Sequence, residues 1–357
     1  MNVQLKWLKQ LVFLAIAITI LGACSSYGPQ TMSRDQADYG RSVGDSWKNQ
    51  MLANLVKLRF VDMPVFVEVG QIVSGYTLET QVNAAVGFSN SVIGDDTQSL
   101  GASGKYTDRP TITYTPKTGE GFLRSMLVPV NPSSLLSLVQ AGYSSEVLFA
   151  WGVESVNGVR NYSNKGQNTS APDPEFIEFV GLLSELQRAG AIGMEIEKDP
   201  STKHDSVFFF SDRTMDEGIM EKRDRARKLI GLKQGQQNFR VLYAPFATED
   251  DVLAIQTRSI LQMLSSMSGF IDVPADKADQ ALPGSSVPEG ASRPFHVRTS
   301  RERPEDPFAS FRYHGDWYWI DHTDIASKGV FLLMLFLTTL TDGGDDQTAP
   351  VLTIPTS

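Results

Sequence analysis

The sequence contains little cysteine and little histidine, and these shortages exclude several kinds of chemistry. Cys24 is the only cysteine among 357 residues, so the chain has no internal disulfide and no cluster of thiolates for a metal. There are four histidines. Motifs for serine hydrolases, zinc proteases, phosphate-binding loops and dinucleotide folds are absent from the sequence. We therefore expect a protein that is not an enzyme and has no bound cofactor or metal.

Positive charge is also scarce. Lysine and arginine number 32 against 41 acidic residues, which gives a net charge of −9. An acidic surface repels phosphate backbones, so we expect no nucleic-acid partner. The 19 Phe, 10 Tyr and 5 Trp indicate a packed globular body rather than a disordered chain.

An uninterrupted stretch of apolar residues occurs at the N terminus. Lys6 and Lys9 precede residues 11–21, which are apolar except for Thr19, and small residues follow. This order is typical of a secretory signal. The apolar stretch is about half of the roughly 20 residues that a membrane-spanning helix needs. We expect residues 1–23 to be a cleaved signal peptide.

The quartet Leu21-Gly22-Ala23-Cys24 resembles the lipobox of bacterial lipoproteins. The resemblance implies cleavage before Cys24 and acylation of its thiol, so that Cys24 holds the protein to membrane lipid. Ser25, and not an aspartate, follows the cysteine, which by the same resemblance favours the outer membrane, with the body facing the periplasm. The alternative is an ordinary signal peptide with a cysteine near its cleavage site.

Residues 24–44 are small and polar without periodicity, which predicts a tether. Helical spacing of apolar residues predicts a first helix that begins at Asp45 or Ser46 and ends before Pro64.

Period-two alternation then occupies two long stretches, 72–88 and 100–114, in which most even positions are apolar or small. The pattern predicts a long amphipathic β-hairpin. Three roles stay open: the hairpin covers a core, it is a flexible insertion, or several copies combine their hairpins in an oligomeric outer-membrane channel or secretion device.

The remaining pattern predicts an α+β fold with a mixed sheet and packed helices. We expect a helical pair at 131–156, which completes a region of residues 45–157, then a linker or loop at 158–173 and an α+β domain at 174–357. A long helix is predicted from Thr248 through Met267, with acids in its first turn.

The C-terminal segment predicts a hairpin around Gly315-Asp316 as a type II′ turn, followed by a helix that Asp321 and Asp324 cap. Its interior, residues 329–340, has no charge and predicts a helix buried on all sides.

The candidate site lies in this hairpin. The aromatic residues Tyr313, Trp317 and Trp319 could bind sugar or peptide. His314 and His322 lie close in sequence to several aspartates, so a His–carboxylate site is a further hypothesis. Helix capping already explains Asp321 and Asp324, which favours a structural role for these carboxylates.

The sequence thus favours a non-enzymatic binding or assembly component of the cell envelope. Its partner would be an envelope protein or a glycan, and a homo-oligomer stays open. The alternatives are the channel or secretion subunit above and an envelope hydrolase. Residues 109–116, 121–122 and 350–355 resemble runs in uncharacterised Gram-negative lipoproteins, a resemblance that implies no activity.

Overall fold

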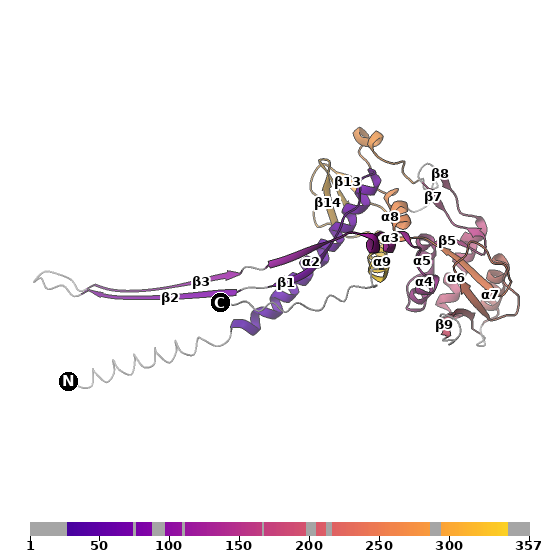
Figure 1. Ribbon diagram of the computed structural model, residues 1–357, viewed down its shortest axis with the longest axis horizontal. Coiled ribbons are helices and arrows are strands. Elements are labelled where there is room, and N and C mark those ends of the chain that lie inside the picture. Colours follow the sequence, from indigo (N-terminus) through magenta and orange to yellow (C-terminus); the bar gives the residue numbers. More distant parts are fainter. Residues whose placement is uncertain are drawn as a thin grey trace, which may run out of the picture. The chain divides into compact units, whose positions relative to one another are not determined.

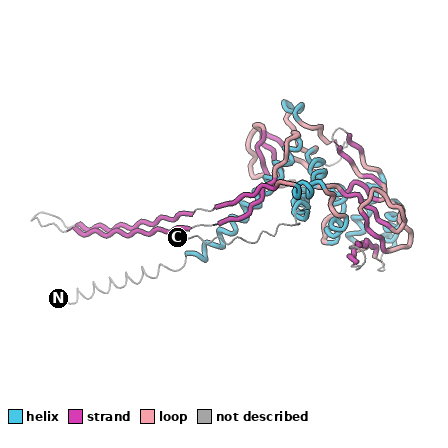
Figure 2. Tube along the Cα trace, in the orientation of Figure 1, coloured by secondary structure: helices cyan, strands magenta, loops and turns pink. Residues whose placement is uncertain are grey.

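The computed structural model describes residues 27–73, 76–87, 97–108, 111–165, 168–197, 205–211, 216–285 and 294–341 (Figures 1 and 2). The expected signal peptide and Cys24 lie outside these ranges. The chain divides into two compact units, residues 1–49 and 50–357. Helices and mixed sheets together give the predicted α+β class.

The described part of the first unit is helical. Helix α2 (Tyr27–Arg59) begins far before Asp45, so the predicted tether at 24–44 is wrong for residues 27–44. Ion pairs one turn apart accompany this helix, Asp38 with Arg41 at 3.8 Å and Asp45 with Lys48 at 2.7 Å. The early part of the helix has no apolar stripe, and periodicity therefore could not reveal it.

The end of α2 belongs to the second unit and enters its core. Met51, Leu52, Leu55 and Val56 are buried there. The helix stops at Arg59, four residues before the predicted end.

Four strands then form two antiparallel ladders (Figure 1). Strand β1 (Phe66–Val73) pairs with β4 (Thr111–Lys117). Strand β2 (Tyr76–Gly87) pairs with β3 (Thr97–Asp108) from Tyr76↔Asp108 to Gly87↔Thr97, without a shift in register. These pairings match the predicted hairpin, whose connecting residues 88–96 lie outside the described residues.

The helical pair follows α3 (Glu120–Leu127). Helix α4 (Pro132–Gln140) begins after Asn131, whose side chain accepts from the Ser133 amide at 2.8 Å. Helix α5 (Ser145–Gly152) begins after Ser144. It is shorter than predicted, because Val156 lies in strand β5 (Val153–Val156).

A six-stranded mixed sheet has the order β6-β5-β12-β11-β10-β9. The further strands are β6 (Val159–Arg160), β9 (Ile192–Glu197), β10 (Asp205–Phe210), β11 (Asn238–Leu242) and β12 (Val252–Thr257). Only the β11–β12 pair among these is parallel. Helices α6 (Pro174–Arg188) and α7 (Glu217–Leu229) contact each other.

The predicted domain boundary at 158–173 is wrong, because it separates strands of this one sheet. Asn157 and Gly158, with φ of 46° and 88°, form the two-residue turn that joins β5 to β6. Strands β7 (Ser163–Lys165) and β8 (Asn168–Ser170) pair within the expected linker. Gly and Asn here indicated a turn rather than the end of a domain.

The helix predicted from Thr248 to Met267 is confirmed only from Ile260 onward and is wrong before it. The chain forms β12 and then α8 (Ile260–Ser268). Four successive apolar residues of β12, Val252 to Ile255, are buried, as expected for a strand whose two faces are both covered. The helix start is instead marked by a capping box of Ser259 and Gln262.

The C-terminal module begins after η1 (Ala275–Gln280) and contains β13 (Arg298–Ser300), β14 (Ala309–Tyr313) and β15 (Asp316–Ile320), in the order β13-β15-β14. Its turn residues are His314 and Gly315, with φ of 47° and 93°. Both angles are positive, so the turn is of type I′ and lies one residue before the predicted type II′ turn.

Helix α9 (Ile325–Thr341) follows, and Asp324 caps it as predicted by accepting from the Ser327 amide at 3.0 Å. It is not buried on all sides. Ile325, Leu332 and Phe336 are 72%, 41% and 49% exposed. Among the described residues, no helix combines the length and the apolar composition that crossing a bilayer requires.

Candidate functional site

The three-stranded C-terminal sheet has a buried face and an outer face. Along β15, Asp316, Tyr318 and Ile320 are buried, whereas Trp317 and Trp319 between them are only partly covered. The ring of Phe60, at the end of α2, lies 5.6 Å from Tyr313 and 6.1 Å from Tyr318 on the buried side. The predicted aromatic group is therefore divided, with Tyr313 facing inward and the two tryptophans outward.

Each outward tryptophan lies in a row that crosses the sheet. Trp319 has Arg298 on one neighbouring strand and Ser310 on the other. Trp317 has Ser300 and Arg312 in the same positions. Read from β13 to β14, the first row is thus Arg–Trp–Ser and the second row is Ser–Trp–Arg.

Guanidinium groups cover these indole rings. The Cζ atom of Arg298 lies 5.3 Å from the centre of the Trp319 ring, and that of Arg303 lies 5.6 Å from the Trp317 ring. We call this surface the Trp–Arg face, defined by Arg298, Ser300, Arg303, Ser310, Arg312, Trp317 and Trp319. A stacked guanidinium keeps its N–H edge free for carboxylate or phosphate. Stacking also restricts the side chain beforehand, so less conformational freedom is lost when a ligand binds.

The charge on this face is uncompensated at two of its arginines. Within the described residues, neither Arg303 nor Arg312 forms an ion pair, and the positions of the two rows contain no acid. The seven residues of the Trp–Arg face thus include three arginines and no acid, whereas Glu302, Glu305 and Asp306 flank Arg303 in the sequence.

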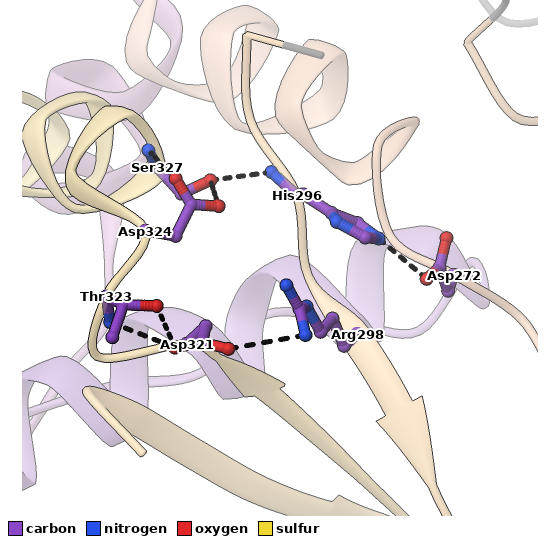
Figure 3. Close-up of polar contacts among 7 residues, drawn as sticks. All are labelled: Asp272, His296, Arg298, Asp321, Thr323, Asp324 and Ser327. Atoms are coloured by element: carbon purple, nitrogen blue, oxygen red, sulfur yellow. Dashed lines mark hydrogen bonds and ion pairs between the residues drawn. The ribbon is translucent and has the colours of Figure 1, made fainter. Parts of the chain in front are cut away.

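Arg298 is held by the turn that follows β15 (Figure 3). Its Nη1 lies 3.3 Å from Oδ2 of Asp321, whose Oδ1 accepts from the amide of Thr323 at 2.9 Å and from its hydroxyl at 2.7 Å. The Thr323 amide, its hydroxyl and the Arg298 charge lower the pKa of Asp321. Asp321 therefore stays ionised and orients Arg298.

A second set of bonds fixes the segment that leads into β13 (Figure 3). Nε2 of His296 lies 2.7 Å from Oδ2 of Asp272. The amide of His296 donates to Oγ of Ser327 at 2.9 Å, and this hydroxyl donates to Asp324 at 2.7 Å. The start of α9 and the segment before β13 are thereby joined. Sequence reasoning missed the pair because Asp272 and His296 are 24 residues apart and only the tertiary fold joins them.

The structure places His314 and His322 at opposite ends of β15. His314 is exposed in the turn before β15, where its ring stacks on Tyr313 at 4.1 Å. His322 is exposed after the other end of β15, and its carbonyl accepts from Lys328. Five strand residues at about 3.3 Å each separate them by roughly 16 Å.

The acids near these histidines also have structural partners. Asp316 pairs with Lys277, and Asp321 and Asp324 hold the turn and the helix start. In the described ranges, no three His, Cys, Asp or Glu residues are grouped so that they could hold a metal.

Comparisons of this chain with protein-family models, with curated proteins and with solved structures give no match.

Proposed function

We propose that this protein is a lipid-anchored component of the bacterial outer membrane that binds an anionic envelope partner through its Trp–Arg face. The observation that carries the proposal is the pair of crossing rows, which display Arg298 and Arg312 beside two indole rings. Acylation at Cys24 would supply the anchor, as the Leu21-Gly22-Ala23-Cys24 resemblance implies.

The same geometry favours binding over catalysis. Arginine stays protonated and serves poorly as a general base, whereas its planar donors recognise carboxylate and phosphate. Asp321 and Asp324, which sequence placed near a histidine, are occupied in holding the turn and helix α9. We therefore propose recognition without a reaction.

Charge neutralisation tests the recognition surface. The full chain in detergent is titrated with carboxylate-bearing peptidoglycan fragments, and bound ligand is followed by tryptophan fluorescence. We expect Arg303→Gln combined with Arg312→Gln to weaken binding at least about tenfold, since charge-assisted hydrogen bonds contribute about 1.5–3 kcal/mol each. Unmodified protein should lose affinity as salt increases.

The matched control is Arg124→Gln, which neutralises an exposed arginine on α3. Equal binding by the double variant, the control and the unmodified chain would remove the Trp–Arg face as the recognition surface.

Mass spectrometry tests the anchor separately. We expect the mature N-terminal Cys24 to carry diacylglycerol, and Cys24→Ser to release the protein from membranes on washing. An unmodified Cys24 in membrane-bound protein would contradict the lipid anchor and leave the binding result unaffected.

A further inference from the structure

The β2–β3 ribbon has two long edges that no strand covers within the described residues. Its twelve-residue strands pair only with each other in the sheets of this chain's described part. Unpaired strand edges present rows of backbone donors and acceptors that accept another strand. An isolated two-stranded ribbon is only marginally stable in water, so a third strand would stabilise it.

The register of the ribbon keeps the alternation of the sequence intact. Even positions pair with even positions, for example Leu78 with Tyr106 and Val82 with Ala102. The odd positions pair polar residues, such as Gln81 with Ser103. Neither strand contains proline, so no position of either edge lacks its amide donor.

Charge distinguishes the two edges. Glu79 is the only charged residue of β2, and β3 contains Lys105 and Asp108. Within one copy, Glu79 and Lys105 are direct cross-strand neighbours. Two β2 edges brought together would have an acid on each strand and no base, whereas a β3 edge offers Lys105 to Glu79 of a neighbouring β2 edge.

We propose that several copies of this chain join their ribbons edge to edge, with β3 of one copy antiparallel to β2 of the next. The ribbons are level, so the register between copies is the same as the register within one copy. In this arrangement, Glu79 and Lys105 alternate along one row that crosses all copies. The even-numbered positions form one continuous face of the combined sheet, and the odd-numbered positions form the other face. Such a contact is heterologous, so it adds copies until a ring closes or a sheet extends.

Cysteine cross-linking between separately tagged copies tests this contact. Gln81→Cys and Ser103→Cys chains are co-expressed, extracted in detergent and oxidised with copper phenanthroline. We expect covalent dimers that carry both tags, because the level alignment places these two positions opposite each other between copies. Their yield should exceed that of a Val82→Cys and Ser103→Cys mixture by about tenfold, since residues of opposite parity lie on opposite faces.

Further mixtures define the register. Glu79→Cys or Asn83→Cys cross-linking to Ser103→Cys in place of Gln81→Cys would overturn the level alignment. Covalent dimers of Gln81→Cys chains alone would overturn the β3-to-β2 contact in favour of a β2-to-β2 contact. The unsubstituted chain, with Cys24 alone, reports any background.

Light scattering of the unsubstituted chain in detergent is the independent measurement. We expect a mass of several copies, and a strict monomer would overturn the proposal. Amide exchange then shows whether residues 342–357 of the same chain cover the ribbon edge in that monomer. The binding experiment on the Trp–Arg face uses other residues, so the two proposals fail independently.

Discussion

Arg298 contacts the ring of Trp319 and the carboxylate of Asp321 at the same time. Its Cζ lies 5.3 Å from the centre of the indole ring, and its Nη1 lies 3.3 Å from Oδ2 of Asp321. The carboxylate after β15 thus sets the position of a cation on β13 above an aromatic ring on β15. Asp321 thus positions the guanidinium group of the first crossing row of the Trp–Arg face.

Removal of this cation should change the environment of Trp319. We expect Arg298→Gln to shift tryptophan emission and to lower the free energy of unfolding by about 0.5–1 kcal/mol, the value of an exposed cation–π contact. The emission shift should vanish in a Trp319→Phe background. Arg301→Gln is the control, because this neighbouring arginine is 83% exposed in its side chain. A shift of equal size in the Trp319→Phe background would show that Trp319 does not report the contact.

Arg258 should contribute much more to stability than any arginine of the Trp–Arg face. It is 4% exposed and donates to the carbonyls of Ala150, Trp151 and Tyr162, and burial lowers its pKa to about 10. Arg258→Met leaves three carbonyls without this donor, so we expect a loss of about 3–5 kcal/mol in chemical denaturation.

Arg188→Met is the control for this loss. Arg188 lies in the last turn of α6 and bonds to Ser184, so its removal should cost less than about 1 kcal/mol. Similar denaturation midpoints for the two variants would mean that the hydrogen bonds of Arg258 do not contribute the expected stability.

Local signals in the sequence predicted the parts of the fold that neighbouring residues determine. Asn131 before Pro132 marked the start of α4, and Asp324 marked the start of α9. Alternation predicted the strands that pair as β2 and β3. These signals depend on residues only a few positions apart, and the sequence displays them directly.

Sequence failed where distant segments determine the outcome. The apolar run in β12 fits a helix as well as a strand until neighbours on both sides, β11 and β5, identify it as a central strand. For the candidate site, Trp317 and Trp319 were identified as aromatic residues beside the predicted turn of the C-terminal hairpin. Arg298 and Arg312 were missed, because only the register of three strands brings them beside these rings. Arg303 was missed, because only the folded loop between β13 and β14 places it over Trp317.

Asp324 should stabilise the start of α9 through two bonds to Ser327. Its Oδ1 accepts from the Ser327 amide at 3.0 Å and its Oδ2 from the hydroxyl at 2.7 Å. We expect Asp324→Ala to cost about 1–2 kcal/mol in thermal or chemical unfolding, the upper half of the range for a lost helix cap. Asp279→Ala, at an exposed position of η1, should cost less than about 0.5 kcal/mol. Equal effects of the two substitutions would argue against the cap.

The phenol of Tyr318 should make stability fall at high pH. Tyr318 is fully buried, and burial together with the charge of Asp316 raises its pKa from 10.0 to about 12. The folded state therefore retains the proton between these values while the unfolded state loses it, so this contribution is complete below pH 10 and disappears as the pH rises towards 12. We expect tyrosinate absorbance to show a late ionisation that is absent from Tyr318→Phe, whose unfolding free energy declines less steeply over the same interval. Tyr114→Phe, which removes a phenol that is 57% exposed, should retain the late step. A late step that persists in Tyr318→Phe would assign it to another residue and remove the link between this buried phenol and stability.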